Sequence, residues 1–184
     1  SAAGAIAARS SNVNVLLSQV TGCVADSTLL PSLLETMGSG GAFYFEGVSA
    51  LLFGVTVSDC NAIFSGGGLW ATHSAVSVEF TEFQHDHVLR TLDDTAGGGA
   101  MSMVEASSLA MRDSRIYDCS APFGGGCFFT TLATPESNYT ERSTSSSIAA
   151  FFYGRVQIEH CRFEACVADL GGAHYVGRFT SLTI

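Results

Sequence analysis

The sequence has no lysine and few charged side chains of any kind. Its eight basic residues are all arginines, and seventeen acidic residues bring the formal net charge to −9 at pH 7. A chain with this much negative charge is repelled by a phosphate backbone, so nucleic acid is not expected as a partner. Catalysis that depends on a lysine amine has no residue to use.

Prolines and long apolar runs are also scarce. No stretch of about 18 uninterrupted apolar residues occurs, so no membrane-spanning helix is expected. The 184 residues include three prolines and twenty glycines, and 47% of them are apolar. This composition favours short strands joined by tight turns. We expect one all-β domain over residues 1–184.

A glycine phrase recurs along the chain. A pair or triplet of glycines followed by a small or apolar residue occurs five times, and a weaker sixth copy begins at Gly4. Because glycine adopts a positive φ without steric cost, we expect one glycine of each copy to form a corner of the chain. These predicted corner glycines are Gly41, Gly68, Gly99, Gly126 and Gly172.

A strand-like phrase lies between the glycines. Each copy has apolar residues at alternate positions, such as Val76 and Val78, which is the periodicity of a β-strand. Each copy then ends in an apolar residue, two spacers and, in most copies, a cysteine. The residues at this last position are Cys23, Cys60, Asp86, Cys119 and Cys166.

The repetition of both phrases at matched offsets predicts a solenoid. A coil of a solenoid can bury its inward face only against its neighbours, so the same pattern must return in each coil. Short strands with glycine corners predict a parallel β-helix of about five coils. The spacing between copies is irregular, so the extra residues are expected in loops, the longest being a Ser/Thr-rich insertion at 128–150.

The two phrases together resemble the repeats of polymorphic membrane proteins, a family of bacterial autotransporter adhesins in which Gly-Gly-Ala alternates with Phe-x-x-Asn. Related repeats occur in large extracellular β-helix proteins. The resemblance covers residues 4–176 and departs from the family at its asparagine, which is replaced here by cysteine or by Asp86. It implies a right-handed parallel β-helix, display at the cell surface, and adhesion or scaffolding.

Both ends of the sequence fall partway through a repeat. Residues 177–182 match the opening of the preceding repeat, and residues 4–5 match a glycine phrase. Neither end carries the polar capping segment that protects the edge of a solenoid. We therefore expect an internal fragment of a longer protein.

The cysteines allow two interpretations. If the repeats stack in register, Cys23 and Cys60 are neighbours about 4.8 Å apart, as are Cys119 and Cys166, and this spacing permits two disulfides between coils. A ladder of buried free thiols fits the same pattern. Cys127 and Cys161 fall outside this column, so they could pair with each other or stay free.

One sequon points to an extracellular or cell-surface location. Asn138 is followed by Tyr139 and Thr140, which satisfies the rule for N-glycosylation, and it lies in the predicted insertion. We expect a glycan on Asn138. The same location would favour disulfides.

Catalytic and metal sites find little support. Polysaccharide-active β-helices gather carboxylates and a basic residue on adjacent coils, but no such candidate recurs on a neighbouring coil here. The spacing of His160, Cys161 and Cys166 matches no standard zinc pattern. We assign no catalytic residue, metal or cofactor. The candidates weighed are His85, Asp86, His87, Asp93, Asp94, His160 and Arg162.

Two functions remain. The first is an extracellular structural or adhesive scaffold whose partners are other subunits, other parts of the same long chain, or cell-surface glycans. The alternative is a carbohydrate-active or carbohydrate-binding β-helix. Three or more clustered polar or ionisable side chains on consecutive coils would favour the alternative, whereas aromatic or glycosylated outer faces would favour the scaffold.

Overall fold

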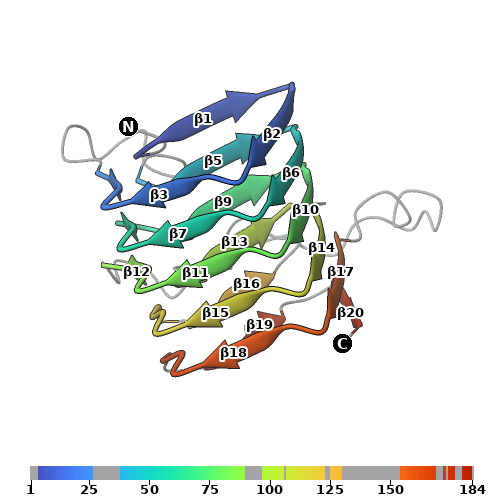
Figure 1. Ribbon diagram of the computed structural model, residues 1–184. Helices are drawn as coiled ribbons and strands as arrows, with labels where there is room; N and C mark the ends of the chain where they lie inside the picture. Colours follow the sequence, from blue (N-terminus) through green and yellow to red (C-terminus); the bar gives the residue numbers. More distant parts are fainter. Residues whose placement is uncertain are drawn as a thin grey trace, which may run out of the picture.

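A computed structural model describes residues 4–26, 38–89, 97–105, 107–122, 125–129, 154–168, 172, 174–176 and 180–183. Within these ranges the chain is all-β, and its strands pair in parallel into four sheets (Figure 1). The described residues contain no helix long and apolar enough to cross a membrane.

Sheets A and B are the two largest and contain six strands each, stacked in chain order. Sheet A is formed by β1 (Ile6–Arg9), β5 (Phe43–Glu46), β9 (Leu69–Thr72), β13 (Met101–Val104), β16 (Cys127–Phe129) and β19 (His174–Val176). Sheet B is formed by β2 (Asn12–Leu16), β6 (Ser49–Phe53), β10 (Ala75–Glu79), β14 (Ser108–Arg112), β17 (Gly154–Glu159) and β20 (Thr180–Thr183).

Sheets C and D are built from shorter strands. Sheet C is formed by β3 (Gln19–Thr21), β7 (Thr56–Ser58), β11 (Glu82–Gln84), β15 (Arg115–Tyr117) and β18 (Arg162–Glu164). Sheet D is formed by β4 (Val24–Ala25), β8 (Asn61–Ala62) and β12 (His87–Val88).

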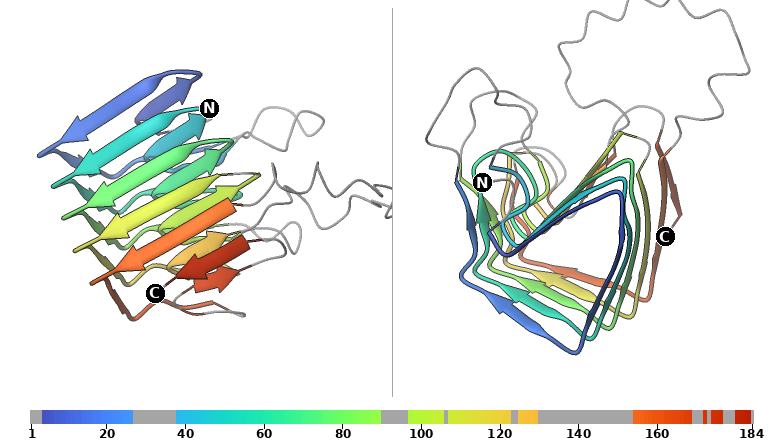
Figure 2. Two further views of the ribbon diagram at one scale, coloured as in Figure 1. Left: turned by 90° about the vertical axis from the view of Figure 1, so that its right-hand side faces the viewer. Right: turned by 90° about the horizontal axis from the view of Figure 1, so that it is seen from above.

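The chain visits the sheets in a fixed order and then returns to sheet A beside its previous strand there. We call one such passage a layer: β1–β4, β5–β8, β9–β12, β13–β15 and β16–β18 are layers 1 to 5, and β19 and β20 follow them. Seen along the stack, strands of successive layers lie over one another (Figure 2).

The pairing register agrees with the predicted alternation. In sheet B, Val76 pairs with Ala50 on one side and Leu109 on the other. In sheet C, Phe83 pairs with Val57 and Ile116. The matched offsets of the sequence phrase are thus confirmed as neighbouring positions in the sheets.

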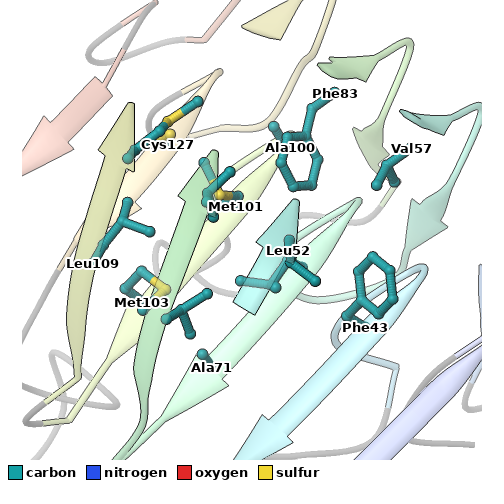
Figure 3. Close-up of a cluster of buried hydrophobic side chains, with 14 of the residues drawn as sticks. Phe43, Leu52, Val57, Ala71, Phe83, Ala100, Met101, Met103, Leu109 and Cys127 are labelled. Carbon is teal, nitrogen blue, oxygen red and sulfur yellow. The ribbon is translucent and has the colours of Figure 1, made fainter. Parts of the chain in front are cut away.

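The alternating apolar residues form one continuous core between the sheets (Figure 3). Phe43 and Phe45 enter it from sheet A, Leu52 from sheet B and Phe83 from sheet C, all with no exposed surface. Each such side chain contributes about 1.5–3 kcal/mol through burial. The fold is stabilised by contacts between layers, because strand neighbours come from different layers.

Three corners in each of layers 1 to 4, and two in the described part of layer 5, are turned by a single residue with a positive φ. At the corner between sheets B and C even Leu17 and Phe80 adopt this left-handed conformation, which costs about 1–2 kcal/mol in residues other than glycine. The three columns are Ser10, Gly47, His73 and Glu105 between sheets A and B; Leu17, Gly54, Phe80, Asp113 and His160 between B and C; and Gly22, Asp59, His85, Asp118 and Ala165 between C and D.

The glycine phrase has a different geometry from the predicted one. A positive φ occurs at Gly40, Gly66 and Gly98, ahead of the predicted corner glycines Gly41, Gly68 and Gly99. Strand pairing also aligns Gly67, not Gly68, with Gly41, since Phe43 pairs with Leu69. By the same register Gly125, not Gly126, falls in this column with Gly172.

A close approach between layers explains the aligned glycine column. A Cβ atom on Gly41 would lie 1.8 Å from the carbonyl oxygen of Gly67, and one on Gly99 would lie 2.2 Å from that of Gly125. No side chain fits at these distances. The column therefore consists of Gly4, Gly41, Gly67, Gly99, Gly125 and Gly172.

Candidate functional site

The last position of the repeated phrase forms a column at the corner between sheets C and D. Pairing of Phe83 with Val57 and Ile116 fixes the register before this column, and bridging of His87 to Asn61 and Ser120 fixes it afterwards. The five aligned residues, here called the corner column, are Cys23, Cys60, Asp86, Cys119 and Cys166.

The cysteines of the corner column hydrogen-bond within their own layer. The Cys60 thiol donates to the carbonyl of Ser58 at 3.3 Å, and the Cys119 thiol donates to that of Tyr117 at 3.3 Å. Both residues are fully buried. Burial raises the pKa of the Cys60 and Cys119 thiols well above their ordinary value, so both remain protonated near neutral pH.

All six cysteines carry free thiols in this structure. The bridges from Cys23 to Cys60 and from Cys119 to Cys166 therefore stay predictions. The corner column does contain both pairs as neighbours in adjacent layers, which is the arrangement that such bridges require.

Cys127 and Cys161 lie away from the corner column. Cys127 belongs to β16 and is fully buried, whereas Cys161 precedes β18 and is half-buried. Burial raises the pKa of Cys127, and the nearby Cys166, Cys119 and Cys161 raise it further. Several thiols thus lie close to Cys127 in layers 4 and 5, and which of them pair, if any, stays open.

Asp86 interrupts the column with a carboxyl group that has no exposed surface. Its Oδ1 accepts a hydrogen bond of 2.9 Å from the backbone N–H of Cys60 in layer 2. Its Oδ2 is buried and has no hydrogen-bond partner. Burial raises the pKa of Asp86 well above its ordinary value, and the negative charge of Asp59 adds to this shift.

The candidate catalytic histidines do not converge with Asp86. His85 occupies a left-handed corner, with Nδ1 at 3.7 Å from Oδ1 of Asp59 and Nε2 at 3.4 Å from Oδ2 of Asp118. His87 instead shares a 2.8 Å hydrogen bond between its Nδ1 and Oγ of Ser120. The consecutive residues 85 to 87 therefore belong to different environments and do not form one site.

His160 and Arg162 are also separate. His160 lies at the corner between sheets B and C, 3.5 Å from Asp113, while Arg162 pairs with Glu164 on sheet C. Asp93 and Asp94 lie outside the described residues. Among the residues that are described, no group of three His, Cys, Asp or Glu side chains could hold a metal ion.

An ionic ladder crosses the outer face of sheet C over three layers. Arg115 Nη1 lies 3.4 Å from Oε1 of Glu82 in layer 3, and Arg115 Nη2 lies 2.6 Å from Oε2 of Glu164 in layer 5. Arg162 pairs with Glu164 as well. The four side chains connect layers 3, 4 and 5 through alternating charges.

An aromatic ring lies beside this ladder. The Tyr117 hydroxyl donates a 2.5 Å hydrogen bond to Oε1 of Gln84, and the Arg115 guanidinium lies 4.6 Å from the centroid of the Tyr117 ring. The His85 ring meets the same ring edge to face at 5.1 Å. Glu82, Gln84, Arg115, Tyr117 and Glu164 are here called the sheet C patch.

The sheet C patch was not identified from the sequence, although its signal was present. The apolar column of Phe83 and Ile116 points inward, so the residues immediately before and after each of these must point outward. Applying that rule to residues 82, 84, 115, 117, 162 and 164 would have placed polar side chains on one face of consecutive layers.

The charges of the patch do not match those of a glycosidase. A general acid in such an enzyme needs a raised pKa. Here the hydrogen bond from Arg115 holds the pKa of Glu164 below its ordinary value. The patch can bind polar groups through its exposed atoms, but Glu164 is poorly suited to donate a proton.

The outer face of sheet A is covered, in contrast to that of sheet C. Tyr44 and Trp70 stack there with ring centroids 4.7 Å apart, yet their exposed fractions are 0% and 6%. In the next layer Ser102 accepts a 2.8 Å hydrogen bond from Ser65, which lies between β8 and β9. The segment that connects layer 2 to layer 3 therefore packs on this face.

The predicted glycosylation site Asn138 lies outside the described residues, as does most of the predicted insertion at 128–150. Its first two residues, Phe128 and Phe129, belong to strand β16.

Comparison of the chain with protein-family models, with curated proteins and with solved structures finds no match. No family is therefore assigned.

Proposed function

We propose that this chain is a segment of a right-handed parallel β-helix with a structural or adhesive role in an extracellular or cell-surface protein. The observation that carries this proposal is the recurrence of layers in strict register, with each sheet built from strands that return after one complete passage. Parallel strands joined by crossovers are right-handed in almost all proteins, which supports the proposed hand.

The outer charges support a scaffold rather than an enzyme. On sheet C, Arg115 and Arg162 together balance the charges of Glu82 and Glu164, so these groups pair with one another across layers. Partners of such a scaffold are other subunits, other parts of a longer chain, or glycans of a cell surface. The resemblance to adhesin repeats points the same way.

The secreted state can be tested by intact mass of the native protein before and after reduction and glycosidase treatment. We expect Cys23, Cys60, Cys119 and Cys166 to react with an alkylating agent only after reduction, and we expect a glycan on Asn138. Six thiols that alkylate in the unfolded protein without reduction, together with an unmodified Asn138, would contradict the extracellular location.

A carbohydrate-binding face is the second candidate function, and the sheet C patch favours it. Tyr117 offers a half-buried ring, and Gln84, Arg115 and Glu164 offer hydrogen-bonding groups on three successive layers. Flat rings beside polar groups suit the alternating apolar and hydroxyl surfaces of a sugar.

Binding of neutral and acidic polysaccharides to the wild-type chain and to Tyr117→Ala tests this candidate. Phe80→Ala is the matched control, because Phe80 is 54% exposed at another corner. Loss of binding in Tyr117→Ala alone would support a sugar-binding face. Absence of binding in the wild type would leave the scaffold function in place.

A further inference from the structure

Most of the described corners share one hydrogen-bond pattern. At nine of the described corners, the residue after the left-handed one has a hydroxyl or thiol that donates to the carbonyl two residues earlier. These donors are Ser18, Cys23, Cys60, Ser74, Thr81, Ser114, Cys119, Cys161 and Cys166.

Asp86 occupies the same position without a donor. It follows His85, which has a positive φ, and the carbonyl two residues earlier is that of Gln84. An ionised carboxylate only accepts hydrogen bonds, so it cannot repeat the pattern. Its Oδ2 is one of two buried side-chain oxygens without a hydrogen-bond partner among the described residues, the other being Oδ1 of Asn61.

Among the described residues around Asp86 there is no cation to balance a negative charge, and only backbone hydrogen bonds with Cys60 and Gln84 favour the ionised form. Layer 2 presents Cys60 and Asp59, and layer 4 presents Cys119; the thiols are neutral and Asp59 is negative. On its own layer, His85 pairs with Asp59 and Asp118, and His87 with Ser120. Among the ion pairs of the described residues, none involves Asp86.

We propose that Asp86 is a neutral carboxylic acid in the folded protein, whose O–H donates a hydrogen bond to the Gln84 carbonyl as the hydroxyls and thiols of nine other corners do within their own layers. The cost of ionising this acid then makes the stability of layer 3 fall as pH rises. The protonation state of the Asp86 side chain thus controls the stability of layer 3. Protonated, it completes the corner pattern; ionised, it places an unpaired charge in the core.

The sign of the pH dependence follows from burial, which favours the protonated form. Unfolded, Asp86 titrates near its ordinary pKa of about 3.9. Below about pH 3.9 Asp86 is protonated in both the folded and the unfolded protein, so its contribution to stability is at its maximum. Because the folded pKa is higher than the unfolded one, this contribution decreases as pH rises towards the folded pKa. Above the folded pKa the group is ionised in both states, and the contribution stays constant at its minimum.

Asp86→Asn provides the main test, with denaturant unfolding measured from pH 4 to pH 9 in a reductant. The amide has nearly the shape of the acid, accepts from Cys60 and can donate to Gln84 at every pH. We expect the unfolding constant of the wild type, relative to the variant, to rise about tenfold per pH unit above pH 4 until the folded pKa is reached. Glu79→Gln is the control, since it makes the same acid-to-amide change on the outer face of sheet B, where, among the described residues, the Ser77 hydroxyl is the only side-chain partner of the Glu79 carboxylate.

Infrared spectroscopy at pH 7 is the second test. We expect a carboxylic-acid carbonyl band in the wild type that is missing in Asp86→Asn, or in Asp86→Cys if the asparagine variant does not fold. Asp86→Cys restores the thiol of the column and can replace Asp86→Asn in the unfolding series too. A wild type without this band, or variants whose stability runs parallel to that of the wild type across the pH range, would overturn the proposal.

Discussion

Single glycines decide how closely neighbouring layers of this protein can approach. In the aligned glycine column, the missing Cβ leaves room for the carbonyl oxygen of the adjacent layer, as between Gly99 and Gly125. The role is steric, and it differs from the left-handed turn predicted for these residues. Any side chain at these positions would force the backbone of the adjacent layer to move.

Gly99→Ala is predicted to destabilise the protein by about 3 kcal/mol or more, because its Cβ would lie 2.2 Å from the Gly125 oxygen and overpacking of this kind forces the backbone to shift. Gly22→Ala is the control. Gly22 has open space around it, and Ala165 already occupies the equivalent corner, so a cost of about 1–2 kcal/mol is expected from its positive φ. Denaturant unfolding of both variants checks the difference, and equal losses would contradict it.

The thiols are predicted to differ in reactivity once the native protein is reduced. Alkylation at pH 8 should modify half-buried Cys23 first, and Cys60, Cys119 and Cys127 last, because those three are fully buried. Burial also raises their pKa, so little thiolate is present to react. Peptide mapping after timed alkylation gives the order, and early labelling of Cys60 would show that the column is open to solvent.

At the scale of strands and corners, hydroxyl groups connect one layer to the next. Oγ of Ser114 donates to its own layer at the Arg112 carbonyl, 2.7 Å away, and accepts from the backbone N–H of Thr81 at 3.1 Å in the neighbouring layer. One small side chain thus satisfies two backbone groups that burial would otherwise leave unpaired.

Ser114→Ala should therefore cost about 1–3 kcal/mol, since it leaves the buried Thr81 N–H without an acceptor. Ser77→Ala on β10 is the matched control, because its hydroxyl makes only a 3.5 Å contact with Glu79 on the outer face. Chemical denaturation distinguishes the two. A Ser114 variant as stable as the Ser77 variant would mean that water replaces the hydroxyl.

Removing the arginine of the sheet C patch is predicted to change the titration of its partner. In Arg115→Gln the pKa of Glu164 should rise, because the hydrogen bond from Arg115 is what holds it low. The stabilisation that Glu164 gains from this pair is present above its unfolded pKa and is lost as pH falls through the folded pKa. An NMR titration of the Glu164 carboxyl measures the shift, and an unchanged pKa would show that Arg162 alone controls it.

At the scale of the whole molecule, each layer is stabilised by the layers next to it. Phe83 and Phe163 illustrate this, because they occupy the same column of sheet C in layers 3 and 5. Phe83 has no exposed surface, whereas Phe163 is partly buried. The same residue type therefore makes unequal contributions at different depths of the stack.

Phe83→Ala is predicted to cost about 3–5 kcal/mol, the range found for a fully buried phenylalanine. Phe163→Ala in the same chain should cost less, because Phe163 is only partly buried. Urea unfolding of the two variants measures both values. Equal costs would mean that layer 5 is as fully covered as layer 3.

The sequence by itself determined the repeat and much of its register. The alternation of Val76 and Val78, and the position of Cys60 three residues after Val57, depend only on local periodicity, so they could be read along the chain and the strand pairing agrees with them. The place of Asp86 in the same column as the cysteines was read in the same way, and the pairing of Phe83 with Val57 agrees with it.

The tertiary structure decided what depends on neighbouring layers. A triplet such as Gly66 to Gly68 does not show which glycine faces a carbonyl oxygen, because that is set by the pairing of Leu69 with Phe43. Likewise, the ionic ladder of Glu82, Arg115 and Glu164 joins residues that are distant in sequence and meet only when layers stack. Periodicity fixes which face of a strand each residue occupies, whereas contact between layers fixes its partner.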